Sequence, residues 1–379
     1  MKVMLVMGTR PEAIKLAPVI DALKAASIQT TICATGQHRE MLDQALQIFA
    51  IEPDVSLSAM QTGQTLNSLA ARLLTGMDIA LDRHRPDWVL VQGDTTTAFC
   101  SGLAAFHRGI PVGHVEAGLR TGDLSNPFPE EANRSLLARI ATLHFTPTQK
   151  NRQALLAEGI PATAIHVTGN TVVDAMQKAH TLANVAQTAG RLPILETILK
   201  AAQDRSLALV TCHRRENLGS VLENICHTLK RLCERHADLY WVFPVHLNPN
   251  VQKPAKSILA GIPNLCLLDP VDYLTSLALI ARASLILSDS GGIQEEAPAF
   301  GVPVIVMRKH TERQEGIAAG FATLAGQTPE NIEAAVDEWL SHPERRKKLK
   351  NSANPYGDGR AAQRIAALLQ GRTTGEFIG

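Results

Sequence analysis

Hydrophobic residues along this chain gather in short, almost continuous runs of Val, Ile and Leu. A break of Gly, Asp or Pro follows each run, and a stretch rich in Ala and Leu comes next. This alternation is typical of βαβ units, and runs without polar positions indicate parallel strands buried on both faces. The first series of predicted strands covers residues 2–7, 29–34, 88–92, 111–115 and 144–146, with helices such as 11–24 and 97–106 between them. The second series covers residues 206–211, 240–245, 265–268, 284–288 and 302–307.

The order of these segments predicts an α/β protein with two doubly wound, Rossmann-like domains that face each other across a cleft. We expect an N-terminal domain over residues 1–170 and a C-terminal domain over 171–354, because Gly and Asn interrupt the pattern at the junction. A second break precedes a last amphipathic helix, 360–369, so residues 355–379 are expected to cross back to the first domain. Ligands of open α/β sheets bind beyond the carboxyl ends of the strands, so the loops there are the functional candidates.

Composition excludes several classes of protein. The 379 residues carry 37 Lys and Arg against 36 Asp and Glu, so the net charge of +1 provides no field that would hold a nucleic acid. No run approaches the roughly eighteen apolar residues of a membrane helix, and the first run, residues 3–7, is too short for a signal peptide. The six cysteines are scattered and include no CxxC, so we expect structural thiols and a cytoplasmic protein.

The first strand ends in the loop GTRPEAIK, residues 8–15, where a dinucleotide-binding protein would carry GxGxxG. No strand-loop-helix unit of this chain has that motif, so no nicotinamide cofactor is expected. Pro11 suits a helix start, and Arg10 and Lys15 add positive charge near the N-terminus of that helix, an arrangement that fits a phosphate. A capped helix with solvated charges explains the same residues equally well.

A glycine-containing loop in the second half, SDSGGIQEE at 288–296, also follows an apolar strand and opens a helix. Ser290, Gly291 and Gly292 would let a diphosphate approach the backbone, and Glu296 could accept from ribose hydroxyls. The alternative is that Asp289 or Ser290 simply caps the helix.

Acidic residues follow the third and fourth strands of the first domain, and basic residues follow strands of the second. Paired acids in different environments are what proton transfer requires, although each of these carboxylates could also be a cap or an ion-pair partner. A metal site formed by His213, His246 and Asp94 is an alternative, but no HxH or HxxxH spacing supports it. The acids are Asp94, Glu116, Glu130 and Glu131, and the basic group consists of His213, Arg214, Arg215 and His246.

Taken together, these segments resemble one family, the bacterial non-hydrolysing UDP-N-acetylglucosamine 2-epimerases. The resemblance runs almost from end to end and implies a glycosyltransferase B-type fold, a homodimer, no cofactor, and reversible inversion at C2 between UDP-GlcNAc and UDP-ManNAc for surface polysaccharide synthesis. The matching strings are GTRPEAIKLAP (8–18), QHREMLDQ (37–44), GDTTT (93–97), PVGHVEAGLRTGDL (111–124), PEEANR (129–134), TGNTVVDA (168–175), HRREN (213–217), PVHLNPNV (244–251), SDSGGIQEEAP (288–298), TER (311–313) and NPYGDGRA (354–361).

The resemblance also implies roles for single residues in a reaction that eliminates UDP to give 2-acetamidoglucal and then adds it back. The acid/base candidates are Asp94, Glu116 and Glu130, with His213 assisting the departure of UDP. Residues implied to bind the UDP-sugar are Arg10, Lys15, His246, Ser290, Gly291, Gly292, Glu296 and Arg313. Some relatives bind a second UDP-GlcNAc as activator, for which the candidates are Gln37, Glu131 and Arg214.

Some positions depart from the pattern of the family. This chain has RKHTERQE at 308–315 where relatives commonly read RDTTERPE, and Asn126 where they have Ser. Glu40 and Gly63 stand where some activated relatives carry Gln and Arg, so weaker activation is expected. The alternatives left open are a hydrolysing 2-epimerase, an epimerase of a related UDP-acetamidosugar, a glycosyltransferase of the same fold and a UDP-sugar sensor without catalysis.

Overall fold

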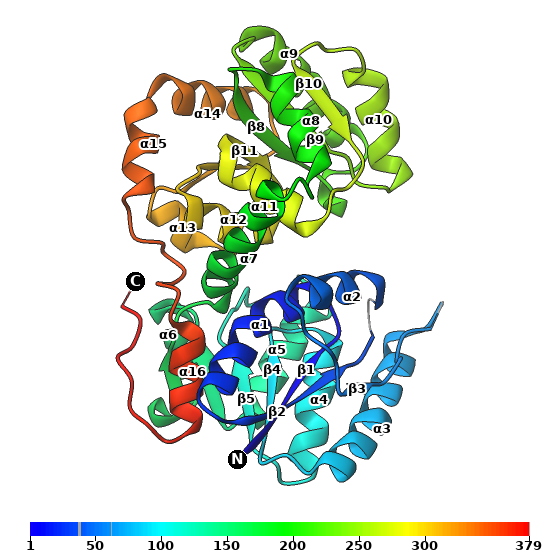
Figure 1. The fold of residues 1–379 in the computed structure, drawn as a ribbon, viewed down its shortest axis with the longest axis vertical. Helices are drawn as coiled ribbons and strands as arrows, with labels where there is room; N and C mark the ends of the chain where they lie inside the picture. The colour runs from blue at the N-terminus through cyan, green and yellow to red at the C-terminus, as the bar shows by residue number, and fades with distance from the viewer. Residues whose placement is uncertain (37–38, 62, 379) are drawn as a thin grey trace. The chain divides into compact units, whose positions relative to one another are not determined.

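The computed structural model describes residues 1–36, 39–61 and 63–378 and divides the chain into two compact units (Figure 1). The first unit combines Met1–Ala175 with Tyr356–Gly379, and the second is Met176–Pro355. The sequence placed the first boundary at residue 170, but the division falls inside the helix α7, Thr171–Thr188. A helix continues through a junction without the change of composition that a linker would show, which explains the difference.

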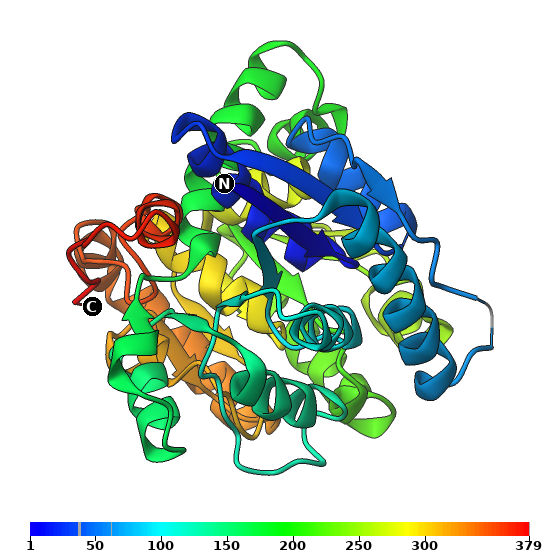
Figure 2. The ribbon, with the colours of Figure 1, turned by 90° about the horizontal axis from the view of Figure 1, so that it is seen from below.

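The first unit has a seven-stranded parallel sheet in the order β3-β2-β1-β4-β5-β6-β7. Helices lie on both sides of this sheet (Figure 2). On one side α16 packs beside α1, and on the other α4 lies between α3 and α5. The strands are β1 (Lys2–Met7), β2 (Gln29–Ala34), β3 (Val55–Ser56), β4 (Trp88–Gln92), β5 (Val112–Val115), β6 (Leu143–Thr146) and β7 (Ile165–Val167). The helices are α1 (Arg10–Ala25), α2 (Arg39–Ile48), α3 (Leu66–His84), α4 (Thr96–His107), α5 (Glu130–Ile140), α6 (Gln149–Ala157), a 3₁₀ turn (Ala162–Ala164) and α16 (Ala361–Leu369).

The second unit has a six-stranded parallel sheet in the order β10-β9-β8-β11-β12-β13. Its strands are β8 (Ser206–Thr211), β9 (Leu239–Pro244), β10 (Leu265–Leu268), β11 (Ala283–Ser288), β12 (Val304–Val306) and β13 (Ala322–Leu324). Its helices are α8 (Pro193–Ala202), α9 (Ser220–Arg235), α10 (Pro249–Leu259), α11 (Tyr273–Arg282), α12 (Gly291–Glu296), α13 (Gln314–Ala318), α14 (Pro329–Ser341) and α15 (Pro343–Lys350), with 3₁₀ turns at Arg215–Asn217 and Ala297–Phe300.

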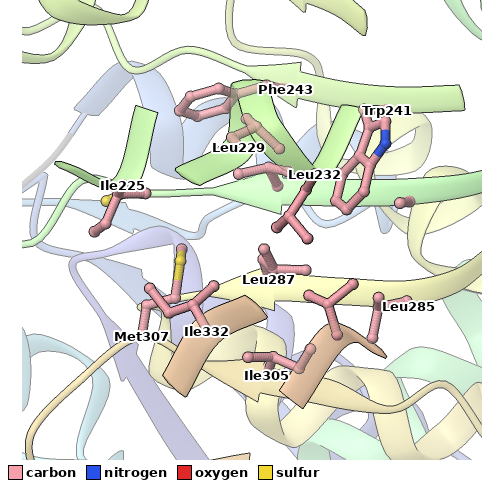
Figure 3. Packing of buried hydrophobic residues seen from close by; sticks show 14 of the residues in the cluster. Ile225, Leu229, Leu232, Trp241, Phe243, Leu285, Leu287, Ile305, Met307 and Ile332 are labelled. Carbon is pink, nitrogen blue, oxygen red and sulfur yellow. The ribbon is translucent and has the colours of Figure 1, made fainter. Parts of the chain in front are cut away.

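Helix α9 shows why this unit holds together. Ile225, Leu229 and Leu232 recur at helical spacing and are buried against Trp241 and Phe243 of β9 (Figure 3). Large apolar side chains in such contact remove area from water, which is the main favourable contribution to folding. Cys226 and Cys233 lie in the same buried cluster as free thiols, so they pack as small hydrophobic residues.

The predicted fold class is confirmed, since each unit is an α/β domain with a parallel sheet and helices packed on its faces. The strands at 2–7, 29–34, 88–92, 206–211 and 265–268 have the expected bounds. Sequence reasoning missed β3, β7 and β13, which have two or three residues each. No helix in the described part of the chain is long and apolar enough to span a membrane.

Candidate active site

Each sheet has one place where the order of its strands reverses, and the candidate residues gather beside these places. In the first unit the reversal lies between β1 and β4, which pair with Leu5 opposite Leu90. In the second it lies between β8 and β11, which pair with Thr211 opposite Ser288. Adjacent loops diverge at such switch points and leave room for ligands, so these are the expected binding positions of the two sheets.

The buried carboxylate of Glu12 ties the two loops of the first switch point together. It accepts hydrogen bonds from the backbone N–H groups of Gly8 and Thr9 at 2.9 and 2.7 Å, and from the hydroxyls of Thr9 and Thr95 at 2.8 and 2.6 Å. Burial raises the pKa of Glu12, while these donors lower it. The helix is therefore capped, by a capping box, as the alternative from the sequence has it, but of its two charges only Arg10 is partly exposed and Lys15 is buried.

Lys15 and Glu116 form a buried ion pair in the first unit. The Lys15 ammonium nitrogen lies 2.6 Å from Oε2 of Glu116, and the side-chain amide of Gln92 donates to the same oxygen at 2.6 Å. Glu116 directly follows β5 and has a left-handed backbone with φ of +64°. The neighbouring cation favours the charged form of this carboxylate, so the effect of Lys15 on the site is to keep Glu116 charged.

Asp94 lies at the end of β4, next to a second buried cation. Nη1 of Arg134 is 3.3 Å from Oδ2 of Asp94, and the side-chain amide of Asn133 donates to the Asp94 carbonyl at 2.9 Å. Nη2 of Arg134 is also 2.6 Å from the buried Glu131 carboxylate. The α5 helix thus fixes Asp94 from two successive residues, neither of which was singled out from the sequence, although both stand in the PEEANR string.

Glu130 and Glu131 point to different surroundings although they are neighbours at the start of α5. Glu130 is partly exposed, whereas Glu131 is buried and accepts from the backbone N–H groups of Thr121 and Gly122 at 3.1 Å. Glu131, proposed from the sequence as an activator contact, therefore holds the loop before α5. Gln37, the other candidate of that kind in this unit, lies outside the described residues.

His213 and His246 follow β8 and β9 in the second unit, and their rings stack with centroids 5.8 Å apart and planes at 15°. The side chain of His213 is 39% exposed, and His246 and Arg214 are also exposed. The backbone N–H groups of His213 and Arg214 donate to the buried carboxylate of Asp289 at 2.9 and 2.8 Å. The two imidazoles thus stand on a loop that a buried acid holds in place.

The glycine loop after β11 is not built as a conventional helix cap. Ser290 is the N-cap of α12, but its side chain makes no capping hydrogen bond, and Asp289 bonds to the loop after β8 instead. A Cβ added at Gly291 would lie 3.2 Å from Cζ of Arg313, so a larger residue here would press against the guanidinium, which would have to shift by a few tenths of an ångström. Arg313 is held by Glu295 at 2.9 Å, and Glu296 is partly exposed. The capping alternative is therefore wrong for both residues.

The structure groups the candidates within each unit but gives no sign of a metal centre. Among the side chains it describes, no group of three His, Cys, Asp or Glu residues could hold a metal ion. Sequence reasoning missed the buried residues that hold the candidate loops in place, namely Glu12, Asn133 and Arg134. It also considered Asp289 only as a helix cap and not as a buried carboxylate. A charged residue directly after the predicted strand 284–288 was the available signal for Asp289.

Comparison with known proteins agrees with this geometry. The family model for UDP-N-acetylglucosamine 2-epimerases matches residues 21–370. UDP-N-acetylglucosamine 2-epimerase of Escherichia coli K12 is 47% identical over 376 residues, which are 98% of each chain. The crystal structure of the Neisseria meningitidis UDP-GlcNAc 2-epimerase bound to UDP-GlcNAc matches with a TM-score of 0.88 at 42% identity, covering 98% of this chain and all of that one.

A more distant structure shows the same fold. The Methanocaldococcus jannaschii UDP-GlcNAc 2-epimerase in complex with UDP-GlcNAc and UDP has a TM-score of 0.81 at 34% identity and covers 98% of this chain and 99% of its own. The resemblance drawn from the motifs and its glycosyltransferase B-type fold are thereby confirmed. With a family model over most of its length and relatives that align from end to end, this chain belongs to the UDP-N-acetylglucosamine 2-epimerase family.

Proposed function

We propose that this protein interconverts UDP-GlcNAc and UDP-ManNAc as a non-hydrolysing 2-epimerase. The observation that carries the proposal is the pair of carboxylates, Asp94 and Glu116, at the ends of the adjacent strands β4 and β5, each beside a buried cation. Two differently supported carboxylates at one sheet edge suit the removal and return of a proton.

The chemistry must avoid a simple carbanion, because no carbonyl group activates the C2 proton of the sugar. In the proposed route a base takes that proton, the C–H electrons form the C1–C2 double bond, and the C1–O bond breaks with both electrons leaving on UDP. The product is 2-acetamidoglucal. UDP then adds back to C1 while an acid delivers a proton to the opposite face of C2, so the sugar is inverted without net oxidation or hydrolysis.

In this proposal the candidate residues have separate roles. Asp94, Glu116 and Glu130 handle the C2 proton, and the cations beside the first two favour their charged, basic forms. Arg10, His246 and the loop 290–292 bind the diphosphate, Glu296 accepts from the ribose, and His213 donates to the leaving oxygen. Departure of a diphosphate generates charge, which such donors stabilise.

We also propose that the protein works as a homodimer in the cytoplasm and supplies ManNAc units for surface polysaccharide. Support for the dimer comes from Ile79, Phe106 and Leu136, exposed apolar side chains on the neighbouring helices α3, α4 and α5. Light scattering of the wild type and of Leu136→Glu tests this, and a monomeric wild type would contradict it.

The test of the activity is proton NMR of the purified protein with UDP-GlcNAc in deuterated water. UDP-ManNAc should appear with solvent deuterium at C2 and without any added cofactor. Free ManNAc and UDP as the only products would establish hydrolysis instead, and transfer to an added acceptor would establish a glycosyltransferase.

Four variants test the site. Asp94→Asn, Glu116→Gln, Glu130→Gln and His213→Asn should each lower kcat by about a hundredfold or more, the scale of a lost general acid or base. Calorimetry should still detect UDP binding to each. Near-normal turnover in two or more of them would show that the site is assigned wrongly, even if the wild type is an epimerase.

A further inference from the structure

Asp289 is a fully buried carboxylate at the switch point of the second sheet, 0% exposed. The register of β8 and β11 places Ser288 opposite Thr211, so the residues after each strand lie side by side. Oδ2 of Asp289 accepts from the backbone N–H groups of His213 and Arg214 and from the side-chain amide of Asn217, at 2.8 to 2.9 Å. One oxygen therefore holds the whole loop after β8.

The second oxygen of Asp289 has a different neighbour. Oδ1 has no hydrogen-bond partner in the described structure and lies 3.5 Å from Nδ1 of His213. A buried acceptor without a partner is unfavourable, so a small rotation of the imidazole that brings Nδ1–H onto Oδ1 is favoured. The His213 backbone is already anchored to the same carboxylate.

The surroundings of the His213 ring fit this orientation. One face stacks on His246, whose own Nδ1 accepts the backbone N–H of Asn248 at 3.1 Å. His213 nevertheless keeps 39% of its side chain exposed. With Nδ1 directed at Asp289, Nε2 is the ring nitrogen that would exchange a proton in the proposed reaction.

We propose that Asp289 is a positioning residue that accepts the Nδ1–H of His213 and thereby presents Nε2 to the leaving diphosphate. The inference rests on the proposed function. During elimination, Nε2 gives its proton to the departing UDP oxygen and the ring becomes neutral with its proton on Nδ1; on re-addition Nε2 takes the proton back. The Asp289 carboxylate stabilises the protonated ring, as carboxylates do in other acid–histidine pairs.

The experiment is long-range proton–nitrogen NMR of the intact protein with ¹⁵N-labelled histidine, in the presence of UDP at pH 8. His213 is assigned by the signal that His213→Asn removes. We expect the neutral ring to carry its proton on Nδ1 in the wild type. A wild-type ring protonated on Nε2 would overturn the proposal without any variant of Asp289.

Asp289→Asn provides the decisive change. The two backbone N–H donors hold the amide oxygen on their side, so the NH₂ group faces Nδ1 of His213 and should move the ring proton to Nε2. Asn217→Ala is the matched control, since it removes a donor to Oδ2 and loosens the same loop but keeps Oδ1. The control should retain the Nδ1–H form. An unchanged tautomer in Asp289→Asn would overturn the proposal.

Kinetics separates positioning from a merely structural role. Asp289→Asn should lower kcat by about tenfold to a hundredfold with KM within threefold, because the diphosphate contacts remain while the donor is lost. A loss of kcat/KM of the same size that came entirely from a higher KM would contradict the positioning role of Asp289. If the wild type shows the expected tautomer but no epimerisation, the proposed function fails and the Asp289–His213 contact stands. If the wild type epimerises its substrate but carries the ring proton on Nε2, the proposed function stands and the role of Asp289 fails.

Discussion

Mild acid is expected to destabilise the first unit through two buried imidazoles. His114 and His144 face each other across β5 and β6, and both are almost completely buried. Burial lowers the pKa of His114 from 6.5 to about 3 and that of His144 to about 4. Below pH 6.5 the unfolded chain therefore binds protons at these two imidazoles that the folded chain does not bind. The stability is complete above pH 6.5 and is lost as the pH falls below it.

The size of the effect follows from these values. Between pH 8 and pH 5, each imidazole should remove about 2 kcal/mol from the free energy of unfolding, or about 4 kcal/mol for the pair. Asp174 acts in the opposite direction, because burial raises its pKa from 3.8 to about 6 and the folded state takes up a proton there, which returns about 1.4 kcal/mol. The net loss from these three groups, about 3 kcal/mol, is large against the typical 5–15 kcal/mol of folding.

Urea unfolding at pH 8, 7, 6 and 5 measures this loss. His144→Leu should recover about 2 kcal/mol of it, because the variant has one imidazole fewer to charge. His107→Gln is the control, since His107 is exposed at the end of α4 and should leave the pH dependence as in the wild type. The reasoning is refuted if wild-type stability is flat between pH 8 and 5, or if His144→Leu loses as much as the wild type.

Three other outcomes are expected. Lys15→Met should destabilise the protein by about 3–5 kcal/mol in urea at pH 8, because Glu116 keeps a buried charge without its cation; an unchanged midpoint would disprove the ion pair's importance. Ser290→Ala and Glu296→Ala should each weaken UDP binding by about 1–3 kcal/mol in calorimetry, and unchanged dissociation constants would mean that this loop does not touch UDP. Rate curves with UDP-GlcNAc should be sigmoidal, and pure UDP-ManNAc should react only after a lag, because an activator must favour the active state; hyperbolic curves and immediate turnover would exclude a second site.

The sequence by itself determined the class of fold and the loops that carry chemistry. Apolar runs such as residues 3–7 and 207–210 cannot lie at a surface without exposing their side chains, so their burial in parallel sheets follows from local pattern alone. The same pattern placed Asp94, Glu116 and His213 in the loops that begin where strands end. Strand β7 lacked that signal because a histidine separates its two apolar residues.

Tertiary structure alone decided what each charged residue does. Glu130 and Glu131 are equivalent in sequence, yet one is partly exposed and the other is buried against Arg134, because α5 turns by about 100° between successive residues. Lys15 meets Glu116 from 101 positions away, and Asp289 reaches His213 from 76. Local patterns cannot report such pairs, since the strand order that brings the partners together is set by the packing of the whole sheet.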